Sequence, residues 1–154
     1  MCSRLLGRPH LSEKPVEEVA SYLQRIMVSE DTTVRGLLVT GMQGGQGPAN
    51  VPENMRGASL PAWRSNYLHI VAFGATIDPN ATAQDALTAA GRWMNGYKEL
   101  IWQEWAPDSG SYMNEANCYN TNFKNDFYGA NYDRLVEIKQ KYDPSESLFV
   151  LTGV

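Results

Sequence analysis

The sequence predicts an α+β domain in which an antiparallel sheet carries its helices on one face. Three observations lead to this fold class. Helical and extended segments follow in the order helix, strand, strand, helix, strand, helix, which lacks the regular alternation of a parallel sheet. The 154 residues suffice for one hydrophobic core. The apolar strand ends have no partner on the N-terminal side, so we expect the sheet to continue in further sequence.

The first half of the chain is expected to contain a helix, a strand and a long loop. Residues 11–30 read as the helix, because Pro15 suits a first turn and apolar side chains recur after it at helical spacing. Val34 to Met42 reads as the strand, since the run Leu37–Val39 is too continuous to face solvent. Glycines and prolines mark Gln43–Pro61 as the loop.

The second half is expected to contain two more strands, two helices and one short terminal strand. The first of these strands carries His69, and the last helix has basic residues near its C-terminal end, where the helix dipole favours them. The predicted elements are, in order, Tyr67–Ile77, about Ala81–Trp105, Ser111–Asn117, about Ala130–Tyr142 and Leu148–Leu151.

Charge and composition exclude several classes of partner. The net charge is −4 and no run of five like charges occurs, so neither nucleic acid nor an anionic membrane surface is expected. No apolar stretch approaches the roughly 18 residues of a membrane span. No metal site is expected, because Cys2 and Cys118 alone make a poor one and His10 lies outside any ligand-type spacing.

Two side chains are candidates for acid–base chemistry. In an alternating strand Glu115 shares a face with Ser111 and Met113, and burial there would suit it to proton abstraction. A solvated edge residue is the alternative. His69 lies in an apolar run. It is either a core histidine satisfied by a neighbouring carbonyl or a polar group that projects into a cavity, where it orients or deprotonates a substrate hydroxyl.

Two further motifs have simple interpretations. Gly44-Gly45-Gln46-Gly47 lacks the Lys-Ser/Thr of a phosphate loop and the spacing of a dinucleotide fingerprint, so a plain loop is expected and NAD chemistry has no support. Asn80-Ala81-Thr82 is a glycosylation motif at a turn. It matters only if the protein is secreted, and the sequence leaves the localisation open.

An aromatic group on the predicted long helix supports a different function. The aromatic residues Trp93, Tyr97, Trp102 and Trp105 could form a surface for a ligand or partner. On this alternative the chain is a standalone, non-catalytic binding module.

The last third of the chain resembles a known family. Tyr112-Met113-Asn114-Glu115 is followed by Phe127-Tyr128-Gly129 and then by a basic amphipathic helix that ends at Asp143-Pro144. This order of motifs resembles the C-terminal segment of the berberine-bridge-enzyme-like FAD-linked oxidoreductases, which have the vanillyl-alcohol-oxidase-type fold. The resemblance is most specific over Ser111–Pro144 and Asn66–Phe73, and it is loosest before residue 40.

The resemblance implies a domain arrangement. Residues 1–109 would form the C-terminal part of a substrate-binding domain, and residues 110–154 the berberine-like segment that packs back toward the flavin domain. The implied partners are a small-molecule substrate and an N-terminal FAD-binding domain that lies outside this chain. The chain is therefore expected to be a fragment that is inactive by itself.

The resemblance also implies a reaction and its residues. A small organic or carbohydrate substrate would be oxidised by hydride transfer to FAD, with Asn114 and Tyr112 lining the flavin and substrate pocket. Many members have a catalytic tyrosine after the asparagine, whereas this chain has Glu115 there. Glu115 or His69 would be the base.

Overall fold

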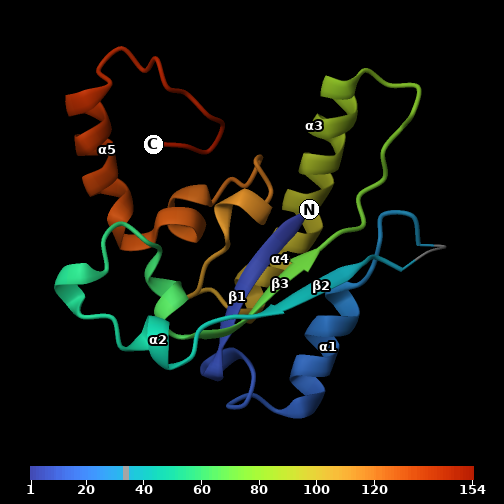
Figure 1. The fold of residues 1–154 in the computed structure, drawn as a ribbon. Coiled ribbons are helices and arrows are strands. Elements are labelled where there is room, and N and C mark those ends of the chain that lie inside the picture. The colour runs from blue at the N-terminus through green and yellow to red at the C-terminus, as the bar shows by residue number, and fades with distance from the viewer. Residues whose placement is uncertain (33–34) are drawn as a thin grey trace.

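The computed structural model describes residues 1–32 and 35–154, and its sheet confirms the predicted α+β class. Three strands pair antiparallel in the order β1-β3-β2 (Figure 1). They are β1 (Cys2–Gly7), β2 (Leu38–Met42) and β3 (Asn66–Ala72). Because β3 is central, its His69 lies opposite Leu5 on one side and Gly41 on the other.

The longer helices begin and end within the predicted helical segments, whereas the short helix α2 falls inside the predicted loop Gln43–Pro61. Within the described residues the α-helices are α1 (Val16–Ile26), α2 (Gln46–Ala49), α3 (Ala83–Trp93), α4 (Glu99–Trp105) and α5 (Tyr132–Tyr142). A π-helical turn at Met94–Lys98 joins α3 to α4, so the predicted long helix is continuous but irregular. A second π-helical turn spans Lys124–Tyr128, and 3₁₀ turns lie at Arg8–His10, Glu53–Met55, Pro61–Arg64, Met113–Glu115 and Gly129–Asn131.

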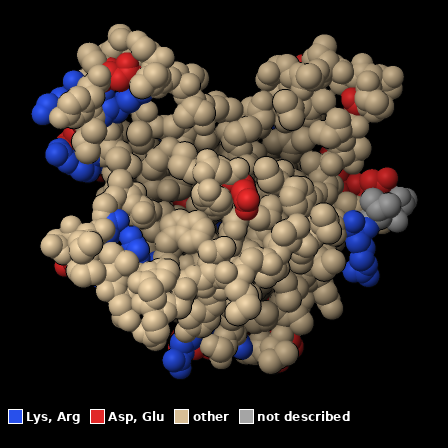
Figure 2. Space-filling model, viewed as in Figure 1, with Lys and Arg blue, Asp and Glu red and all other residues tan. Residues whose placement is uncertain are grey.

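One face of the sheet packs against α1 and the α3–α4 unit. Alternate residues of β1 and β3, among them Leu6 and Ile70, join Ile26 of α1 and Ile101 of α4 in one buried cluster. Figure 1 shows α4 behind the sheet and α3 continuing beyond its upper edge. The opposite face of the sheet points toward the viewer, and in Figure 2 most charged side chains lie at the rim of this view, with one acidic patch near its middle.

The predicted aromatic surface on the long helix is wrong. Trp102 and Trp105 are buried in the core, where their rings stack at 5.6 Å. Trp93 and Tyr97 also stack on each other and pack partly buried against the same core. The sheet requires an apolar partner on its helical face, and these rings supply much of it.

The sequence pattern does not predict β1, because the polar residues Ser3 and Arg4 interrupt its apolar run. All six of its residues are buried. Its outer edge is covered by residues 109–111: the Leu5 N–H donates to the Gly110 carbonyl at 2.8 Å, and the Ser111 hydroxyl donates to the Ser3 carbonyl at 2.6 Å. The edge strand is therefore closed to further pairing over these residues.

Two predicted strands are wrong. Ser111–Asn117 is not a strand, because its Met113–Glu115 part forms a 3₁₀ turn. Asparagine side chains there bond the local backbone instead: Asn117 Oδ1 accepts from the N–H of Tyr119, an interaction that competes with a strand ladder. Leu148–Leu151 is exposed and forms no strand.

The other strands are shorter than predicted. The predicted start of β2 at Val34 lies outside the described residues, and the observed strand begins at Leu38. The central strand β3 ends at Ala72, whereas the prediction continued it to Ile77. Among the described helices, none has the length and hydropathy needed to cross a bilayer.

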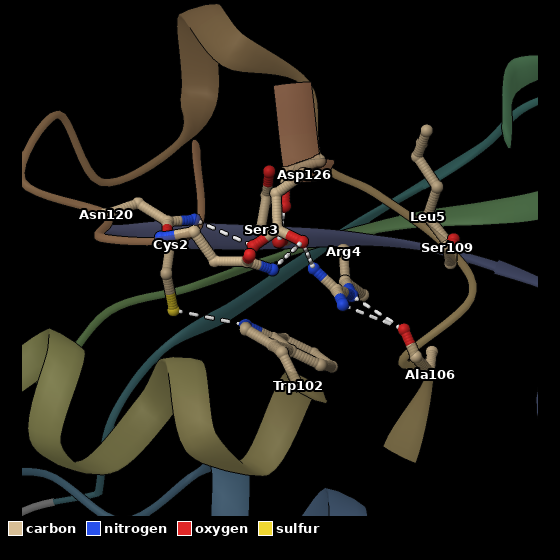
Figure 3. A network of polar contacts seen from close by, with 11 residues as sticks. Cys2, Ser3, Arg4, Leu5, Trp102, Ala106, Ser109, Asn120 and Asp126 are labelled. Carbon is tan, nitrogen blue, oxygen red and sulfur yellow. Dashed lines mark hydrogen bonds and ion pairs between the residues drawn. The ribbon is translucent and has the colours of Figure 1, made fainter. Parts of the chain in front are cut away.

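A fully buried ion pair joins β1 to the segment after α4. An Arg4 Nη atom lies 2.8 Å from Asp126 Oδ1, and both side chains are completely buried (Figure 3). The rest of the guanidinium donates to the carbonyl of Ala106, at 2.8 and 3.1 Å. Asn120 donates an amide hydrogen bond to the other oxygen of Asp126 at 2.9 Å. The two charges are thus paired and largely satisfied by hydrogen bonds.

Two more ionisable residues are buried where the π-helical turn meets α4. The Lys98 ammonium donates to the Ile26 carbonyl, and burial lowers the pKa of this lysine to about 8. Glu99 is 2% exposed, and burial raises the pKa of its carboxyl to about 8. Asp126 raises that pKa further, and Arg4 opposes the shift. Glu99 therefore stays mostly protonated in the folded chain at neutral pH.

We expect Asp126→Asn to lower the free energy of unfolding by about 3–5 kcal/mol, because it leaves Arg4 buried without a counter-charge. Urea denaturation followed by circular dichroism measures the change. The control is Glu137→Gln, which breaks the exposed pair with Arg134 and should change little. A loss no larger for Asp126→Asn than for Glu137→Gln would contradict this account.

Glu99 should make the stability fall as pH rises. The carboxyl has an ordinary pKa of 4.5 and a folded-state pKa of about 8, so between these values the folded chain holds a proton that the unfolded chain has released. Relative to Glu99→Gln, the wild-type free energy of unfolding should therefore decline from pH 5 to pH 8. Denaturation series of both proteins across this range measure the difference, and parallel curves would refute the expectation.

Candidate functional site

His69 lies at the centre of the sheet, on the face away from the helices. Strand alternation puts Leu68 and Ile70 toward the helical core, so His69 points the opposite way. Its side chain is almost fully buried, and Nε2 has no hydrogen-bond partner among the described residues. The alternative of a core histidine satisfied by a carbonyl therefore has no support in this geometry.

Two aromatic rings cover His69. Trp63, from the 3₁₀ turn before β3, has its ring centre 6.0 Å from that of His69, and Tyr112 has its own at 5.7 Å in an edge-on arrangement. Trp63 and Tyr112 also meet edge to face at 5.6 Å. We call these three residues the ring cluster. The sequence prediction did not include Trp63 among the site residues. Trp63 belongs to the segment Pro61-Ala62-Trp63-Arg64, which lies shortly before the predicted strand.

The 3₁₀ turn at Met113–Glu115 brings a carboxylate to the ring cluster. Glu115 Oε2 lies 3.6 Å from His69 Nδ1, and the Glu115 side chain is 48% exposed. Asn114 donates an amide hydrogen bond to the Tyr112 hydroxyl at 2.9 Å. The structure thus places all four predicted site residues together: Tyr112, Asn114, Glu115 and His69.

The predicted route to this arrangement is wrong in one respect. A strand would have put Glu115 on the same face as Ser111, but the turn separates them. Ser111 is buried against Ser3, whereas Glu115 is half-exposed beside His69. The turn therefore leaves the carboxylate open to solvent or a ligand on one side.

Burial and charge act in opposite directions on His69. Burial lowers the pKa of its imidazole, and the nearby Glu115 carboxylate raises it to a smaller extent. The imidazole is therefore mainly neutral near pH 7. With its proton on Nδ1, facing Glu115, Nε2 is left as an unpaired acceptor.

A cavity of about 340 Å³ lies beside the ring cluster. Trp63, Tyr112 and Asn114 form part of its wall, together with Leu60 and Phe127. This wall is mostly apolar and aromatic, and its polar side chains are the Asn114 amide and the hydroxyl groups of two tyrosines and two serines, Tyr112, Tyr128, Ser59 and Ser111. Such a lining is typical of sites for small organic molecules.

The described residues offer little of what a metal site or a phosphate site requires. These residues contain no group of three or more His, Cys, Asp or Glu side chains that could hold a metal ion. The helix α2 has only four residues and begins inside the Gly44–Gly47 motif, at Gln46. The two cysteines are free, with Cys2 buried and Cys118 exposed.

The fold and this arrangement define a class: an α+β domain that presents an imidazole, a carboxylate and aromatic rings on the open face of its sheet. Residues 111–149 match the family model described as "Berberine and berberine like". They contain all of the predicted site residues except His69.

Two similar curated relatives are named as an FAD-linked oxidoreductase and a VAO-type flavoprotein oxidase. The chain is 35% identical over 96 residues to the FAD-linked oxidoreductase apf9 of Gibberella fujikuroi, a match that covers 62% of this chain and 16% of that protein. It is 36% identical over 94 residues to the VAO-type flavoprotein oxidase VAO615 of Thermothelomyces thermophilus, covering 61% and 16%. The chain thus spans about a sixth of the length of these relatives.

Solved structures show the same fold. The VAO-type flavoprotein MtVAO713 of Myceliophthora thermophila C1 superimposes on 98% of this chain with a TM-score of 0.83 at 22% identity, using 25% of its own length. MtVAO615 from the same organism superimposes on 99% with a TM-score of 0.71 at 26% identity, using 26% of its length. The predicted resemblance is confirmed: the chain carries a berberine-like segment and is related to one part of the VAO-type FAD-linked oxidoreductases.

The His69 titration tests the contact with Glu115. We expect the imidazole to titrate below 6.5 in NMR spectra, and Glu115→Gln to lower its pKa further, because the carboxylate that favours the charged form is gone. Tyr112→Phe, which removes a hydroxyl but no charge, is the matched control and should shift it less. An unchanged His69 pKa in Glu115→Gln would show that the two groups are not coupled.

Proposed function

We propose that this chain forms one wall of the substrate site of an FAD-dependent oxidoreductase that acts on a small organic or carbohydrate substrate. The observation that carries the proposal is the Glu115–His69 pair inside a berberine-like fold. The relatives named as FAD-linked oxidoreductases supply the reaction class. When bound, FAD would accept the hydride that such an oxidation removes from the substrate.

The residues of this chain fit the edge of a planar cofactor and the substrate beside it. Tyr112 and Asn114 present a ring and an amide on one side of the ring cluster, and His69 Nε2 is buried without a partner. The described residues offer no cradle for a diphosphate, because α2, the helix that begins inside the glycine-rich motif, has only four residues. FAD would therefore be held mainly by a separate FAD-binding domain.

Within the site we assign to Glu115 the role of the base that takes a proton from the substrate. Its carboxylate is half-exposed and can reach a substrate hydroxyl or amine, whereas the His69 side chain is almost fully buried. His69 would orient the Glu115 carboxylate through Nδ1 and stabilise its negative charge before the proton is taken up. The gap of 3.6 Å between the two groups is typical of a pair that tightens when a ligand binds.

The FAD-binding domain is the proposed partner of this chain. The sheet face that carries the ring cluster has few charges near its centre (Figure 2), as a surface that packs against another domain would have. The chain by itself would have no hydride acceptor and would be inactive. It would acquire activity only together with that domain.

Turnover should depend on Glu115. The experiment expresses this sequence together with the genomic sequence that extends its reading frame upstream, and records the visible spectrum and oxygen consumption. We expect a flavin band, and we expect Glu115→Gln to keep that band while it lowers kcat about 100-fold or more.

Glu137→Gln is the matched control, since Glu137 lies in the same segment but pairs only with the exposed Arg134. It should leave the turnover unchanged. A protein without a flavin band would refute the assignment to this class of oxidoreductase. Full turnover in Glu115→Gln would refute Glu115 as the base while leaving the class intact.

A further inference from the structure

We propose that Asn80 is an acceptor for N-linked glycan when the chain passes through a secretory pathway. Asn80-Ala81-Thr82 is the one Asn-x-Ser/Thr motif without proline at its middle position in the 154 residues. The proposal does not rest on the proposed oxidoreductase function, because it uses a different part of the fold.

The motif lies on an exposed turn. The Ala81 N–H donates to the Asp78 carbonyl at 3.3 Å, which closes a turn over Asp78-Pro79-Asn80, and the Asn80 N–H donates to Asp78 Oδ1 at 2.8 Å. Asn80 itself is exposed. The second bond uses the Asn80 backbone, and among the described residues the Asn80 side-chain amide makes no hydrogen bond. The amide nitrogen is therefore available for chemistry at the surface.

The turn also projects away from the ring cluster. In Figure 1 the connection from β3 to α3 runs at the upper right, at the edge of the sheet face that the view presents. The site residues on β3 and on the Met113–Glu115 turn belong to other segments. A glycan at Asn80 would consequently leave the central part of that face uncovered.

Thr82 has two separate roles in this geometry. Its hydroxyl oxygen caps α3 by accepting the Asp85 N–H at 3.2 Å, and its hydroxyl group donates to the Asp85 carboxylate at 2.7 Å. The same hydroxyl is the one that glycosylation requires two residues after the asparagine. The cap holds Thr82 extended, with φ −64° and ψ 153°, directly after the turn. The cap thus holds Thr82 beside the turn that carries Asn80.

The modification is a simple group transfer. The amide nitrogen of Asn80 forms a bond to the anomeric carbon of an oligosaccharide carried on a polyprenyl diphosphate. The bond from that carbon to the diphosphate oxygen breaks, polyprenyl diphosphate leaves, and the amide loses one proton. No oxidant or reductant takes part, and a secretory-pathway oligosaccharyltransferase would be the catalyst.

The test uses the full chain behind a cleavable secretion leader in a yeast host, with intact mass spectrometry before and after peptide-N-glycosidase treatment. The wild type should carry one glycan, and Asn80→Gln should carry none. Thr82→Ser, which keeps a hydroxyl, should retain it. Asn54→Gln, at an exposed asparagine outside any acceptor motif, is the matched control and should match the wild type.

Thr82→Ala separates the two roles of the threonine. It should lose the glycan and also melt at a lower temperature, because α3 loses its cap. Asn80→Gln, made in a bacterial host without glycosylation, should melt like the wild type from that host. An appended tag with a second acceptor motif serves as a positive control. A tag that is glycosylated while Asn80 is not, or a glycan that persists in Asn80→Gln, would overturn the proposal.

Discussion

The buried ion pair between Arg4 and Asp126 fixes the geometry on which the candidate site depends. Arg4 is part of β1. Asp126 belongs to the π-helical turn Lys124–Tyr128, which lies inside the berberine-like segment. The backbone carbonyl of Asp126 also accepts the Ser111 N–H at 2.7 Å, so the residue holds both ends of the 111–126 segment. An unpaired charge at this depth is so costly that the pair must stay together. That constraint holds the segment against the sheet.

The second constraint is the position of β1 at the edge of the sheet. Residues 109–111 cover this edge through hydrogen bonds to Ser3 and Leu5, and the chain then reaches Tyr112 over the open sheet face. Tyr112 can meet His69 only because Leu5 and His69 are opposite each other in the ladder. Strand register and the covering segment together set the distance between the two candidate acid–base groups.

Sequence reasoning predicted those parts of the fold that a single periodicity determines. The amphipathic helices and the apolar strand around His69 were recognisable, because one face of each is buried in the core. It failed where tertiary contacts outweigh local pattern. β1 contains a charged residue that only Asp126, distant in sequence, makes tolerable. The turn at Glu115 is closed by the Glu115 N–H, which donates to the Tyr112 carbonyl, a local bond that no hydrophobic periodicity reveals. Trp63 was missed because its role comes from contact across the fold.

On the proposed function, the exposure of Glu115 is what a chain that supplies only part of a site would show. His69 lies beneath aromatic rings, while the carboxylate beside it is half in solvent. Water screens the attraction between the carboxylate and a protonated imidazole, and that attraction strengthens as the local dielectric falls. On the proposed function, packing of an FAD-binding domain over this face would exclude that water. The interaction between His69 and Glu115 would then be stronger than in the isolated chain while Glu115 takes the substrate proton. The covering domain would thus contribute to the acid–base chemistry and also supply the flavin.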